Sequence, residues 1–201
     1  MRGLEWSKIG GNQKKNGLRK LSTSANWHNL KIEIDLDRLE GTEEENKIIT
    51  EYILPKIKKK LEKSIRVFGS GILPKIKSTS CDSSFMISSR YSESTTEADL
   101  LLVVEYIKEE SSYLAFAVPC YLDIDTHRPI VGLISINSQN VHPTGKSLMN
   151  DYYTLLHEIF HILAITPPLF QYFQNQPVFT DSERANGTYK LVLPEVGFTC
   201  V

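Results

Sequence analysis

The chain has 201 residues, and its 23 Lys and Arg against 24 Asp and Glu leave a formal net charge of −1. Hydrophobic residues make up 41% of it, an ordinary share for a globular protein, and the length suits one domain with its own core. A charge so close to neutral gives no electrostatic reason to expect nucleic acid or an anionic membrane surface as a partner. No apolar run is long enough to cross a bilayer, and no apolar segment follows the basic N-terminus to complete a signal peptide.

The sequence of the N-terminal half predicts a flexible leader, a strand and a long helix. Residues 1–25 are basic and rich in Gly and Asn, which predicts a flexible leader. Residues 30–36 alternate apolar and charged side chains, as a half-exposed strand does. Thr42 and three following glutamates are typical of a helix start, and apolar residues at helical spacing extend that helix over Glu43–Val67.

Two features of this first helix lead to separate expectations. Pro55 should kink or divide it, because proline lacks a backbone N–H and its ring clashes with the preceding turn. The lysines between Lys56 and Lys63 gather near its C-terminal end, where they complement the helix dipole. Because they oppose an apolar stripe, they are predicted to form a solvated face.

The second half alternates strands with turns before a final helix. Residues 69–96 are rich in Gly, Ser and Thr and read as a loop. Three apolar segments then predict buried strands, at residues 98–107, 113–122 and 130–136. Residues 147–165 are apolar nearly all round, so they predict a central buried helix that Pro167-Pro168 ends. This order indicates a mixed α/β (α+β) fold, a twisted sheet of four or five strands with two long helices on one side.

The run His157-Glu158-Ile159-Phe160-His161 lies inside the last helix. Residues four apart share one helix face, so both imidazoles can reach one ion, while Glu158 points aside toward the attacking water. Two His ligands with Glu as the general base are the arrangement of zinc peptidases. The alternative is a pair of core histidines without an ion, but burying these polar groups unpaired is unfavourable. Tyr153, one turn earlier on the same stripe, could line the site, but it is expected in the core.

The segments around this motif resemble those of the leishmanolysins, a branch of the metzincin zinc proteases. Residues 25–32 resemble the family's opening strand, and residues 95–104 resemble its Ala-Asp strand. Residues 115–120 and 129–137 resemble the next two strands, and residues 157–170 resemble the motif segment. It spans residues 25–175, and it implies a metzincin-like N-terminal catalytic subdomain at 26–175. Residues 176–201 would then be a partial C-terminal segment.

The resemblance also implies an activity, a cofactor and partners. The chain would be a zinc metalloendopeptidase that holds one Zn²⁺ through His157 and His161, uses Glu158 as its base and cleaves protein or peptide substrates. The substrate would lie extended along an edge strand, expected at Ile130–Ile136. The family's disulfides in this region imply a Cys81–Cys120 bridge. An extracellular or cell-surface location, with membrane association, follows from the resemblance too, and a non-catalytic adhesion or interaction protein on the same scaffold is the alternative.

The sequence departs from the metzincin pattern after His161. Metzincins continue with x-x-Gly-x-x-His, whereas here Ala164 replaces the glycine and Pro167 stands where a close third His would be. No histidine follows His161. We therefore expect the third zinc His and the Met-turn beyond Val201, in a chain truncated before them. The alternative is that Glu183 or Glu195 completes the site, as a downstream Glu does in gluzincins.

Overall fold

The computed structural model describes residues 7–9, 27–76, 80–82, 85–142, 145–163 and 165–172. The chain divides into two compact units, Met1–Leu163 and Ala164–Val201. Of the second unit the structure describes one short 3-10 helix, η3 (Pro167–Tyr172), together with the two residues before it.

A five-stranded mixed sheet forms the centre of this unit, with strand order β1-β8-β9-β7-β3. The strands are β1 (Ser7–Ile9), β3 (Ile32–Arg38), β7 (Leu100–Ile107), β8 (Ala115–Asp123) and β9 (Pro129–Asn137). Parallel pairing joins β3 to β7 and β7 to β9, whereas β8 runs antiparallel to β9. The four strands predicted from apolar patterns are confirmed to within a few residues at each end, and the mixed α/β fold with them.

Strand β1 falls inside the segment predicted as a flexible leader. Its three residues pair in parallel with Tyr121–Asp123 at the end of β8. The remainder of residues 1–25 lies outside the described part of the chain. The predicted boundaries of the leader and of the catalytic subdomain therefore stay predictions.

The first helix is continuous through three hydrogen-bonding patterns: α1 (Glu43–Lys47), the π-helix η1 (Ile48–Ile53) and α2 (Leu54–Ser64). Pro55 is the second residue of α2, directly after the π segment. Proline has no backbone N–H to donate, and its ring needs space against the preceding turn. A wider π turn before Pro55 eases both constraints. The expected disturbance at Pro55 thus takes the form of a changed hydrogen-bonding pattern, and the helix does not end there.

The predicted end of this helix, at Val67, is wrong by three residues. Ile65 adopts an extended conformation (φ −113°, ψ 130°), and Arg66–Phe68 forms strand β4. Strand β4 pairs antiparallel with β2 (Trp27–Asn29), with Trp27 opposite Phe68. A β-branched and aromatic run favours a strand once a partner strand is available, and that partner lies about 40 residues earlier in the sequence.

Residues 69–96 are more ordered than the loop that their composition predicts. They contain the strands β5 (Ser80–Asp82) and β6 (Phe85–Met86) and the short helix α3 (Arg90–Glu93). Tyr91 of α3 is buried in a second apolar cluster, with Leu73, Ile76 and Ile87 of the same segment and with residues of β7, β8 and β9. This segment therefore covers one face of the sheet.

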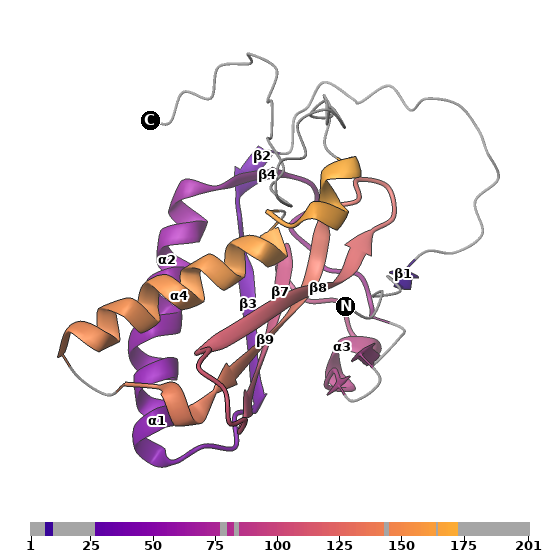
Figure 1. The fold of residues 1–201 in the computed structure, drawn as a ribbon. Helices are drawn as coiled ribbons and strands as arrows, with labels where there is room; N and C mark the ends of the chain where they lie inside the picture. Colours follow the sequence, from indigo (N-terminus) through magenta and orange to yellow (C-terminus); the bar gives the residue numbers. More distant parts are fainter. Residues whose placement is uncertain are drawn as a thin grey trace, which may run out of the picture. The chain divides into compact units, whose positions relative to one another are not determined.

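The long helices cover the other face. The larger apolar cluster joins Ile57 and Leu61 of α2 and Leu155 and Ile159 of α4 (Gly145–Leu163) to inward residues of β3, β7 and β9. In Figure 1, α4 runs across α2 and the strands. The prediction of two long helices on one side is confirmed. None of the helices in the described ranges is long and apolar enough to span a membrane.

Strand β9 is central in the sheet, so the expectation that Ile130–Ile136 forms an edge is wrong. It pairs with β8 on one side and β7 on the other, and all nine of its residues are buried. The physical reason is the tight turn after Asp123, which folds β9 back along β8 while β7 pairs with its other side. Among the described residues, the open edge on this side of the sheet belongs to the first part of β8, Ala115–Cys120.

Cys120 of β8 is disulfide-bonded. Strand β5, which carries Cys81, lies against β8. Both facts support the Cys81–Cys120 bridge that the resemblance implies. The side chain of Cys81 lies outside the described part of the structure. The pairing therefore stays a prediction.

Candidate metal centre

Helix α4 is fixed on the sheet by its apolar stripe. Leu155, Ile159 and Ile162 recur at helical spacing, and all three are completely buried. Ile162 lies directly over Gly132 of β9, where a side-chain Cβ would come within 2.4 Å of it. The absence of a side chain at Gly132 lets the last turn of α4 approach the strand closely, and this turn carries His161.

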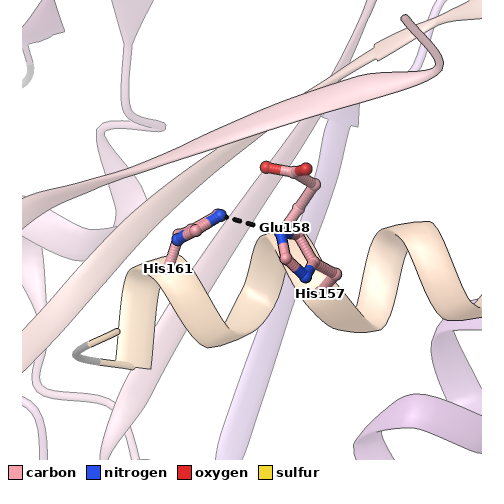
Figure 2. Close-up of side chains that lie close together, drawn as sticks. All are labelled: His157, Glu158 and His161. Carbon is pink, nitrogen blue, oxygen red and sulfur yellow. Dashed lines mark hydrogen bonds between the residues drawn. The ribbon is translucent and has the colours of Figure 1, made fainter. Parts of the chain in front are cut away.

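The two histidines of the motif converge at their outer ring nitrogens. The Nε2 atoms of His157 and His161 are 3.0 Å apart, and the rings stand nearly perpendicular, at 89°. A hydrogen bond between these two atoms requires one ring to carry its proton on Nε2 and the other to carry it on Nδ1. Figure 2 shows both side chains reaching outward from the same face of α4.

Glu158 completes a group of three potential ligands. One ligand atom from each of His157, Glu158 and His161 lies within 4.8 Å of the others. Glu158 lies beside the pair (Figure 2), and it is half-buried, as is His161, whereas His157 is exposed. In the described part of the chain, this is the one group of at least three His, Cys, Asp or Glu residues close enough to hold an ion.

The donor set fits zinc. Two ligands about 2.0–2.1 Å from a tetrahedral zinc are about 3.3 Å apart, close to the separation of these nitrogens. Neutral imidazole is a common zinc ligand, and each ring presents Nε2 to the shared point. The group also lies in the last two turns of α4, which ends at Leu163. The negative end of the helix dipole favours a cation there.

The outer face of α4 is more exposed than its sequence predicts. Met149 is 55% exposed and Tyr153 is 61% exposed, so Tyr153 is not a core residue and α4 is not buried all round. The apolar cluster takes up one face of the helix, and these two exposed side chains lie outside that face. Tyr153 precedes His157 by one turn, so the exposed face that leads to the site carries an aromatic side chain.

Other histidines have partners of their own and do not join this group. His142 lies in the loop before α4, and its backbone N–H donates to Asp151 Oδ2 at 2.7 Å. Its ring Nδ1 is 3.2 Å from Asp151 Oδ1. His28 pairs with Asp99, with Nε2 at 2.9 Å from Oδ2 and 3.0 Å from Oδ1. Both pairs tie separate segments together.

The sequence singles out three further positions near the site or in the C-terminal segment. Glu183, Glu195 and Ala164 lie outside the described residues. The described residues contribute two His nitrogens and one carboxylate to the site.

Comparison with known protein families identifies the family to which the chain belongs. The family model for leishmanolysin matches residues 22–192 of the chain. This match covers most of the sequence, including every strand of the sheet except β1, and the helix that carries the His-Glu-His group. The chain is thus a metallopeptidase-family protein with a mixed sheet and two covering helices. It belongs to the leishmanolysin family, whose members are zinc metallopeptidases. A comparison with curated proteins gave no match.

Proposed function

We propose that this chain is a zinc-dependent metalloendopeptidase in which His157 and His161 hold the ion and Glu158 is the general base. The observation that carries the proposal is the 3.0 Å approach of the two Nε2 atoms, with Glu158 on the next helical position. Membership of a zinc metallopeptidase family supports the same assignment. Two His on one helix face, one turn apart, with an intervening Glu are the pattern that zinc peptidases use.

The catalytic step follows from the placement of these side chains. A zinc ion bound here would supply Lewis-acid polarisation of the scissile carbonyl and would lower the pKa of the attacking water. Glu158 lies beside the histidines, so its carboxylate can accept the proton of that water and pass it to the leaving amine. Such proton transfer contributes about 10²–10⁴-fold to the rate.

The substrate is proposed to lie along β8 instead of β9. An extended peptide adds to a sheet edge through backbone hydrogen bonds, and β9 has none left to offer because both its sides are paired. The edge of Ala115–Cys120 is open among the described residues. Strand β8 also lies against α4, which carries the His-Glu-His group. A peptide on this edge would pass beside the site.

The proposal is tested by zinc binding. Purified protein should bind zinc added in a titration, and His157→Ala and His161→Ala should each lower its affinity by at least tenfold, as loss of a ligand does. His142→Ala is the matched control, since this exposed histidine pairs with Asp151 away from the group. Equal zinc affinity in all three variants and the parent would contradict the assignment of His157 and His161 as zinc ligands.

The third ligand calls for a separate test. Zinc sites normally hold three or four protein ligands, so the two described histidines alone predict weak binding and little peptidase activity. Glu183 and Glu195 lie in a segment rich in Pro, Gly and Asn. We expect Glu183→Gln combined with Glu195→Gln to leave zinc affinity almost unchanged. A large drop in affinity would show that this segment closes a site of the Glu-ligated type.

A non-catalytic interaction or adhesion protein is the second candidate. It is favoured by one observation, the presence of only two His ligands among the described residues. An extracellular or cell-surface location is proposed with either function, on family membership alone. Cleavage of an unstructured protein substrate, abolished by a chelator and restored by zinc, identifies the enzyme. Absence of cleavage in zinc-loaded protein supports the interaction protein.

A further inference from the structure

One face of α2 carries a row of lysines. Lys56, Lys59, Lys60 and Lys63 are all exposed, and their spacing of three, four and seven residues places them on one stripe of the helix. Ile57 and Leu61 occupy the opposite stripe and are buried in the core. Because α2 packs on the sheet through its buried stripe, the four lysines lie on the solvent side of the helix.

These four lysines are not neutralised within the described part of the chain. None of them takes part in an ion pair there, whereas Lys58 of the same helix pairs with Glu62 at 3.5 Å and Lys31 pairs with Glu97. Like charges three and four residues apart on a helix repel one another. The row is therefore an uncompensated concentration of positive charge in a chain whose net charge is −1.

Exposed aromatic side chains lie at both ends of the row. Tyr52, one turn before Lys56, is 54% exposed, and the Lys56 ammonium lies 4.7 Å from its ring centroid. Beyond the C-terminal end of α2, Trp27 of β2 is 53% exposed, and the Arg66 guanidinium donates a hydrogen bond to its carbonyl oxygen at 3.2 Å. Strands β2 and β4 lie next to this end of α2 in Figure 1. We name Tyr52, the four lysines, Arg66 and Trp27 the basic face.

We propose that the basic face docks on an anionic lipid bilayer. The exposed side of a helix is convex, so lysines on one stripe of it can approach a flat surface together. Trp and Tyr beside Lys and Arg are the side chains that favour the boundary between lipid headgroups and acyl chains. Lysines near an anionic surface each strengthen adsorption, and clusters of four or more are typical of such sites.

This attraction is local, which explains why the composition of the chain does not predict it. Charges interact over about 8–10 Å at physiological ionic strength, so a bilayer responds to the side chains that face it and not to the sum over the molecule. Each lysine near such a surface strengthens binding about fivefold, so the four lysines and one arginine give weak, reversible adsorption that salt reduces.

The test is sedimentation of the full chain with vesicles. Vesicles of phosphatidylcholine with about 30% phosphatidylserine should retain the protein at low salt, and vesicles of pure phosphatidylcholine should not. The variant Lys59→Gln with Lys60→Gln should bind about 30-fold more weakly. The matched control is Lys75→Gln with Lys108→Gln, which removes the same charge from two exposed lysines outside α2 and should bind like the parent. Trp27→Ala should weaken binding without changing its salt dependence.

Two results would overturn the proposal. Equal losses in the two double variants would show that overall charge, not the basic face, governs adsorption. Retention on a soluble polyanion such as heparin, with no binding to phosphatidylserine vesicles, would assign the face to a different class of partner. Zinc content and peptidase activity do not enter this measurement, so its outcome is independent of the function proposed above.

Discussion

A Cβ atom on Gly132 would lie 2.4 Å from Cγ2 of Ile162 and 2.7 and 2.8 Å from two further atoms of that side chain. Gly132 is in the central strand β9, and Ile162 is in the last turn of the helix that carries the His-Glu-His group. Both lie in the core, so neither can move aside freely. The contact sets how closely the helix approaches the sheet next to His161.

Gly132→Ala should therefore destabilise the protein. Overpacking of a core typically lowers the free energy of unfolding by about 1–3 kcal/mol. Ile162→Ala should also destabilise, through the cavity it leaves, but the double variant should lose less than the sum of the two because the new methyl group fills that cavity. Urea denaturation followed by circular dichroism measures all three. Strict additivity would mean that the two positions do not share this space.

Asp99 should be a second point of high sensitivity. Its carboxylate is buried, and it accepts hydrogen bonds from the backbone N–H of Lys31 and from His28 while it pairs with Arg128 at 3.5 Å. Asp99→Ala leaves these groups without their acceptor, which should lower the free energy of unfolding by about 3–5 kcal/mol. Asp125→Ala, at an exposed turn position, is the control and should change it little. Similar stabilities for the two variants would contradict this role of Asp99.

The burial of the Tyr91 hydroxyl leads us to expect a loss of stability at alkaline pH. Burial, the largest effect, raises the pKa of its hydroxyl from 10.0 to about 12. Between these values the unfolded chain releases a proton that the folded chain keeps, so stability falls as pH rises from about 10 to about 12. Two pKa units correspond to about 2.7 kcal/mol. Tyr91→Phe should remove this part of the decline in denaturation curves recorded from about pH 9 to about pH 12. An unchanged pH dependence would contradict the assignment.

Glu158→Gln separates the base from the ligands. Zinc affinity should stay close to that of the parent, because Glu158 is proposed to act on the attacking water and not to hold the ion. Any peptide cleavage that the parent shows should be abolished. His161→Gln, which removes a proposed ligand with a similarly small change in size, should lose zinc. Retained cleavage in the Glu158 variant would exclude this residue from the mechanism.

Several elements could be predicted because their signal is local. Alternation over residues 30–36 and apolar runs such as 130–136 locate strands, since a strand side chain's exposure depends on its own position in the pleat. The helix end at Ser64 could not be found in this way. Ile65 and Phe68 continue the helical spacing, and only pairing with β2 draws this run into a strand.

What the sequence determined by itself is the internal geometry of the proposed site. His157, Glu158 and His161 lie on one helix, and helical spacing alone brings two rings four residues apart to the same face. Long-range packing decided the rest. The central place of β9, the exposure of Tyr153 and the contact of His28 with Asp99, 71 residues away, depend on segments distant in the sequence. Periodicity reports which side chains are buried, but it carries no information about which segment buries them.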